Sequence, residues 1–105
     1  MMSYRRYEIL LPTRYNDGEP VEAEKFDLVI EELSDRFGGI TFHPEHLRGV
    51  WLHQGQKFEE ANVQVVVDVE DSPEATGFFA RYKQILKERF RQIDIWIVSH
   101  EIRIT

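Results

Sequence analysis

Histidines are the residues of this sequence best suited to chemistry near neutral pH, and two of them stand close together. His43 and His46 lie three positions apart in the segment HPEH, and His53 follows further along. These imidazoles could bind a metal, because catalytic zinc takes three protein ligands. Pro44, however, interrupts any helix that would bring the first two side chains together, and the sequence has no HExxH motif. We therefore predict a surface loop and no metal site.

His100 stands apart in an extended, mostly apolar segment near the C-terminus. An imidazole there could act as a general base, which makes His100 a weak candidate for a catalytic residue. No nucleophile or carboxylate can be paired with it from the sequence. A structural role, either a hydrogen bond across a subunit interface or a hydrogen-bonded histidine in the core, is the favoured interpretation.

Three further residues are candidates for ligand binding beside His100. Arg14 precedes Tyr15 in the loop TRYNDGE, where the pair could hold an anion, although a hydrated turn is the favoured alternative. Trp51 and Trp96 are the two tryptophans and could line a cleft. No Walker loop, Rossmann fingerprint or Gly-x-Ser-x-Gly elbow is present, and no cofactor is predicted.

Hydrophobic periodicity predicts six elements that would position these residues. A stripe of apolar residues at a spacing of 3.6 marks each helix, and alternation marks the strands. Gly38 follows the first helix, where a left-handed glycine commonly ends a helix, and Ser72 followed by Pro73 is typical of the start of the second. The predicted elements are a strand at 4–11, a helix at 21–37, an interrupted strand at 40–53, a strand at 58–69, a helix at 73–92 and a strand at 93–104.

The order β-α-β-β-α-β predicts an α+β, ferredoxin-like fold. Right-handed crossovers would place both helices on one face of a four-stranded antiparallel sheet. The length of 105 residues predicts a single domain spanning residues 1–105.

Each strand then has one face for the helices and one that is left open. The predicted helix-facing side chains are Tyr7, Ile9, Leu11, Val63, Val65, Val67, Ile93, Ile95 and Ile97. The open face would carry polar residues mixed with Leu10, Val66, Trp96, Val98, Ile102 and Trp51. Monomers rarely expose large apolar patches, so we expect a second subunit, a ligand cleft, or the end of the long final strand folded over this face. The homodimer is the favoured alternative.

Composition and charge narrow the function classes further. The net charge of −6 argues against general binding to phosphate backbones, and the basic stretch from Arg81 to Arg91 is typical of a solvated helix face. A nuclease of this fold class would need an acidic residue at the end of the first strand, and none precedes Asp17. The chain has no cysteine and no apolar run long enough to span a membrane, which favours a cytoplasmic protein.

The segments DRFGGIT, GVW and FEEANVQVVV resemble a family of small, uncharacterised bacterial proteins. The shared pattern is Phe-Gly-Gly-x-Thr, a downstream Gly-x-Trp and an acidic residue that opens the next strand. The matching positions are Phe37, Gly38, Gly39, Thr41, Gly49, Trp51 and Glu59 or Glu60. The resemblance implies a small α+β domain and no particular activity.

Taken together, these features predict a homodimeric module that binds a partner protein or a small ligand through its apolar sheet face. The alternative is a small cofactor-independent enzyme with a cleft on that face, lined by Trp51, Trp96, His100 and Arg14. A nucleic-acid-binding protein or nuclease ranks last.

Overall fold

The computed structural model describes residues 2–105; Met1 and the side chain of His46 lie outside the described part. Along the chain, two helices alternate with the strands of an antiparallel sheet in the predicted order β-α-β-β-α-β. The elements are β1 (Tyr4–Pro12), α1 (Ala23–Phe37), β2 (Thr41–His53), β3 (Gln56–Glu70), α2 (Pro73–Arg89) and β4 (Ile97–Ile102).

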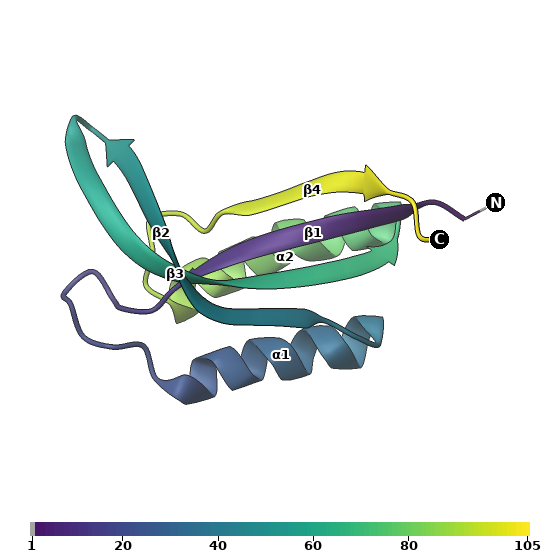
Figure 1. Cartoon of the computed structure of the whole chain (residues 1–105), viewed down its shortest axis with the longest axis horizontal. Coiled ribbons are helices and arrows are strands. Elements are labelled where there is room, and N and C mark those ends of the chain that lie inside the picture. The colour runs from purple at the N-terminus through teal and green to yellow at the C-terminus, as the bar shows by residue number, and fades with distance from the viewer. Residues whose placement is uncertain (1) are drawn as a thin grey trace.

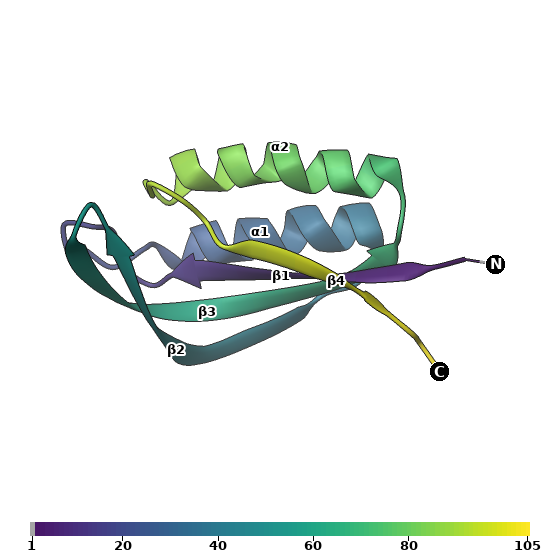
Figure 2. The same cartoon turned by 90° about the horizontal axis from the view of Figure 1, so that it is seen from above.

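The strands pair in the order β2–β3–β1–β4, so β1 and β3 are central. Both helices lie on the same side of this sheet, and the other face has no layer of the chain over it (Figure 2). The predicted α+β class, with an antiparallel sheet and two helices, is therefore confirmed.

The core lies between the helices and one face of the sheet. Alternate residues of β1 and β3 point into it, and Ile9 opposite Val65 is fully buried from both strands. Leu33 of α1 and Leu86 of α2 close the core on the helix side, each with no exposed surface. Burying side chains of this size stabilises the fold by about 1.5–3 kcal/mol each.

The helix ends follow from local sequence. Gly38 has a φ of 88° and its N–H donates to the carbonyl of Ser34, as predicted for a left-handed C-cap. The Ser72 hydroxyl accepts a hydrogen bond from the N–H of Ala75, and Pro73 occupies the first turn of α2.

A long hairpin of β2 and β3 extends beyond the other strands and curves away from them (Figure 1). Gln54 and Gly55 both have positive φ, which fits the tight two-residue turn at its tip. The pairing register shifts between His43 and Leu47, where Pro44 cannot donate a ladder hydrogen bond.

This hairpin corrects the expectation of a simple ferredoxin-like sheet of four strands, although the interruption of the second strand lies where the sequence predicted it. Because the register shift divides β2 into two paired segments, the sheet contains five strand segments. The extra length of the hairpin carries its outer half, including Trp51, past the end of β1.

The last strand is shorter than predicted and begins only at Ile97. Asp94 accepts a hydrogen bond from the N–H of Ile95 at 2.9 Å, which holds residues 93–96 in an irregular connection. Ile95 is buried as predicted, but Ile93 is 50% exposed. The prediction that Ile93 faces the helices was wrong, because strand alternation does not extend into this connection.

The two helices are joined by a charged cluster. The guanidinium of Arg89 donates to both carboxylate oxygens of Glu32, at 2.6 and 2.9 Å, and the Tyr82 hydroxyl donates to the same carboxylate at 2.8 Å. The hydrogen bond from Arg89 lowers the pKa of Glu32, outweighing the effect of partial burial. Burial, assisted by Glu32, raises the pKa of Tyr82.

We expect Glu32→Gln to reduce the free energy of unfolding at neutral pH by about 1–2 kcal/mol, since it weakens a charge-assisted bond. A carboxylate with a lowered folded pKa stabilises fully above its unfolded pKa of about 4.3, and this contribution is lost as the pH falls through the folded pKa. The free energies of unfolding of the variant and the wild type should therefore converge in acid. Urea unfolding at neutral pH and in acid measures this difference, with Glu31→Gln on the exposed face of α1 as the control. An equal loss at both pH values would contradict the assignment.

Candidate functional site

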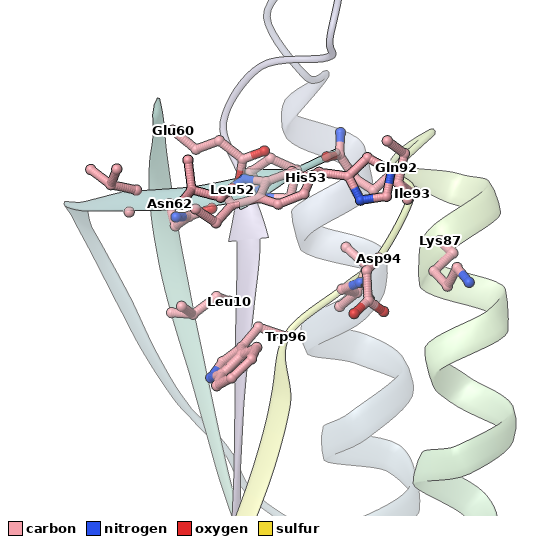
Figure 3. A pocket seen from close by; sticks show the side chains of 15 residues that line it. Leu10, Leu52, His53, Glu60, Asn62, Lys87, Gln92, Ile93, Asp94 and Trp96 are labelled. Atoms are coloured by element: carbon pink, nitrogen blue, oxygen red, sulfur yellow. Dashed lines mark hydrogen bonds between the residues drawn. The ribbon is translucent and has the colours of Figure 1, made fainter. Parts of the chain in front are cut away.

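A cleft of about 790 Å³ lies at the end of the sheet where β1 stops (Figure 3). One wall is the outer half of the β2–β3 hairpin, and the other is the connection between α2 and β4. The volume is in the range usual for small-molecule sites. The lining residues are Leu10, Pro12, residues 49–53, Glu60, Asn62, Lys87 and residues 92–96.

Trp96 reaches the cleft because the last residue of the connection before β4 is tied to β1. The N–H of Leu10 donates to the carbonyl of Trp96 at 3.0 Å, which places the two residues side by side. The Trp96 side chain points away from the helices and is 62% exposed. Two residues later, within β4, Val98 lies opposite Glu8 on the open face. The predicted assignment of Trp96 and Val98 to that face is confirmed.

Trp51 enters the cleft from the opposite wall. It pairs with Phe58 across the hairpin, and the two rings stack with centroids 4.6 Å apart at 19°. His53 follows two residues later on the same strand, with its ring 5.9 Å from that of Trp51. The stack fixes the indole on the hairpin before any ligand binds.

The remaining polar groups of the cleft are mainly acidic or neutral. Glu60 projects from β3, and Asp94 lies on the opposite wall, bound to Lys83 at 3.0 Å. Partial burial tends to raise the pKa of Asp94, but the hydrogen bonds from Lys83 and from the Ile95 N–H outweigh it, and the pKa is lowered. Asp94 is therefore a carboxylate at neutral pH.

Asn62 is a site residue that the sequence analysis missed. Asn62 is only 5% exposed, and it lies on the sheet face away from the helices. Within the polar-apolar alternation of ANVQVVV it is one open-face residue among others, so periodicity places it on that face but does not show that it is buried. The curved hairpin, which brings Gly49 against it, is what encloses the side chain.

His100 lies outside the cleft. It is exposed on the open face opposite Arg6, which donates two hydrogen bonds to Asp68 at 2.8 and 3.0 Å. The bonds from Arg6 lower the pKa of Asp68, and the nearby His100 adds to this effect. The carboxylate near His100 is thus already paired with arginine, and the weak catalytic role predicted for His100 gains no partner.

Arg14 is also separate from the two tryptophans. Its guanidinium donates to the carbonyl of Gly18 at 2.8 Å within its own loop, and it borders a smaller depression of about 270 Å³. Tyr15 is buried and its hydroxyl binds Glu22. The structure therefore brings together Trp51 and Trp96 of the four predicted ligand-binding residues, and leaves Arg14 and His100 elsewhere.

Among the residues that the structure describes, no group of three histidine, aspartate or glutamate side chains is placed to hold a metal ion. His43 lies on β2 opposite Gln64, whereas the side chain of His46 is outside the description. None of the described helices combines the length and apolar character needed to cross a membrane.

Comparison with solved structures finds several similar chains, among them the following three. A divalent cation tolerance protein, CutA1, from Thermus thermophilus is 16% identical, with a TM-score of 0.67 over 97% of this chain and 86% of that one. CutA1 from Ehrlichia chaffeensis is 6% identical, with a TM-score of 0.67 over 100% and 86%. A phage SAM lyase in complex with S-methyl-5′-thioadenosine is 19% identical, with a TM-score of 0.69 over 96% and 90%.

No protein-family model and no curated protein matches the sequence. At these identities the structural likeness defines the class of fold, an α+β domain of the CutA1-like shape, and does not assign an activity.

The wall formed by residues 92–96 should depend on Asp94. We expect Asp94→Ala to speed hydrogen exchange at the Ile95 amide and to lower the free energy of unfolding by about 1–2 kcal/mol, because both the turn acceptor and the ion pair are lost. Asp94→Asn keeps a hydrogen-bond acceptor, so its free energy of unfolding should fall by less. Hydrogen exchange measured by NMR tests this, with the exposed Asp35→Ala as the control. Unchanged exchange at Ile95 in the alanine variant would show that Asp94 does not hold this wall.

Proposed function

We propose that the protein is a small homodimeric binding module whose cleft between the hairpin and residues 92–96 accepts a small ligand. The observation that carries this proposal is the concentration of exposed apolar side chains around that cleft. Association of two chains and binding of a ligand each have separate support.

Five of the nine large hydrophobic residues that are exposed in the described part of the chain border the cleft or its hairpin. Leu52 is 73% exposed and Trp96 is 62% exposed, values that are costly for side chains of this size in a monomer. The five residues are Leu47, Val50, Leu52, Ile93 and Trp96.

The edges of the sheet support the same proposal. β2 pairs only with β3, and β4 pairs only with β1, so each has one side whose backbone groups are not used within the described sheet. Free strand edges readily pair with another chain. A second copy is the simplest partner, because a two-fold contact needs only a surface that complements itself.

The open sheet face contributes less than the sequence predicted. Val66 and Val98 are half-buried on either side of Glu8. The next cross-strand row on this face is polar: Arg6 is paired with Asp68, and His100 on its other side is exposed. We therefore propose that the partner packs mainly against the hairpin and the adjoining end of the sheet face, with the polar row at its margin.

The cleft itself supports ligand binding. It combines aromatic and aliphatic walls with a few polar groups, which is the usual composition of a small-molecule site. The similar phage SAM lyase holds S-methyl-5′-thioadenosine, and we infer that a domain of this shape can also accept a small ligand here.

Catalysis in the same cleft is the second candidate function. It is favoured by the acidic Glu60 and Asp94 and by His53, which line the same cleft and together could move a proton.

We further propose that the chain is a ferredoxin-like domain with an elaborated hairpin. We also propose that it is cytoplasmic and that it is a member of the bacterial Phe-Gly-Gly-x-Thr proteins that it resembles. Nucleic-acid binding is disfavoured by the net charge of −6.

We expect the wild-type protein to have the mass of two chains by light scattering at micromolar concentration. Leu52→Asp should shift the protein to the mass of one chain, because it places a charge in the proposed contact without touching the core. Ile85→Asp is the matched control: it alters an exposed aliphatic residue on α2, and should leave the mass unchanged. A wild-type protein that runs as one chain would refute the homodimer.

A further inference from the structure

We propose that Asn62 is a specificity-determining residue that reads the edge of an adenine base, and that the cleft takes an adenine nucleoside without phosphate groups. The inference rests on the ligand cleft of the proposed function and names the class of molecule that it would accept.

Asn62 has a side chain that is largely enclosed by the protein and still borders the cleft. It is the buried polar residue of the described chain, at 5% exposure, and it lines the cleft. No hydrogen bond joins its carboxamide to another described side chain or backbone group. Every described side-chain nitrogen or oxygen atom that is fully sealed from the surface does have a hydrogen-bond partner. The amide therefore keeps access to the cleft. An amide that is open to the cleft can exchange its contacts with water for hydrogen bonds to a ligand.

The backbone next to Asn62 is arranged to leave room for this amide. A Cβ added at Gly49 would lie 2.9 Å from Nδ2 of Asn62, closer than real contacts of this kind. Gly49 is a residue of the Gly-x-Trp segment, so the same segment that carries Trp51 also leaves space for the carboxamide.

A carboxamide offers a carbonyl acceptor and an N–H donor side by side. Adenine presents the complementary pair, the N6 amino donor and the N7 acceptor, and asparagine binds this edge through two hydrogen bonds. Guanine presents two acceptors, O6 and N7, on the same edge, so the amide could donate to only one of them while its own carbonyl stayed unpaired. The pairing therefore favours adenine over guanine.

The other walls fit a planar base and disfavour phosphate. Trp51 and Trp96 approach from opposite walls, and each indole offers a flat face of the kind on which bases stack. Glu60 and Asp94 bring negative charge into the cleft, and Lys87 is the single cationic lining residue with a described side chain. A nucleoside would meet less repulsion than its phosphorylated form.

The test is a titration with adenosine, followed by tryptophan emission. Because Trp51 and Trp96 are the only tryptophans of the sequence, all the emission comes from the cleft. We expect saturable quenching by adenosine, with guanosine and adenosine 5′-phosphate each binding about tenfold more weakly or worse. Equal quenching by adenosine and guanosine, or none by adenosine at millimolar concentration, would overturn the proposal.

Variants locate the effect at the amide. Asn62→Asp keeps the shape but removes the donor to N7 of adenine, and should weaken adenosine binding about tenfold or more. Gly49→Ala should also weaken it, because the new methyl group displaces the carboxamide, the mobile end of a side chain, without a large cost to folding. Gly39→Ala is the matched control, since nothing lies within 4 Å of its added Cβ. Adenosine binding that is unchanged in both cleft variants would overturn the role of Asn62.

The outcomes separate this inference from the proposed function. A protein of two-chain mass that does not respond to adenosine would refute the adenine site and leave the homodimer standing. A protein of one-chain mass that binds adenosine through Asn62 would refute the homodimer and support the site.

Discussion

The central position of β1, paired with β3 on one side and β4 on the other, is the constraint on which the structure depends. Once Ile9 lies opposite both Val65 and Ile97, alternation assigns every neighbouring side chain of these strands to one of two faces. A slip by one residue would exchange the two faces and expose the core. With both helices on one face, the other must meet water or a partner (Figure 2).

The hairpin turns this open face into a site. Without its extra length, the hairpin would stop level with the end of β1, and the segment that carries Trp51 would be missing. Because the hairpin continues past Pro12 and curves, it faces the irregular segment before β4 and creates a cleft with Trp96 on the other side. The same extension exposes Leu52 and its neighbours, so the apolar surface and the cleft have one structural cause.

The periodic part of the fold could be predicted from the sequence. The inward residues of β1 and β3, the cap at Gly38 and the start of α2 at Pro73 are local signals, and the structure confirms them. The shape of the hairpin and the connection at Ile93 depend on long-range contacts and on the Asp94 turn, which periodicity does not contain. For the same reason the tryptophans could be predicted as candidate site residues, whereas Asn62 is recognisable only once its burial is known.

The central claim is that a second copy covers the apolar side chains at the cleft end of the sheet. Its most direct test is the access of a collisional quencher to Trp96 as the protein is diluted, measured on a Trp51→Phe form in which Trp96 is the only fluorophore of its kind. Covering by a partner predicts weak acrylamide quenching at high micromolar concentration and strong quenching at nanomolar concentration, where the copies separate. Strong quenching at every concentration would contradict it, because Trp96 would then be open to water as in the isolated chain.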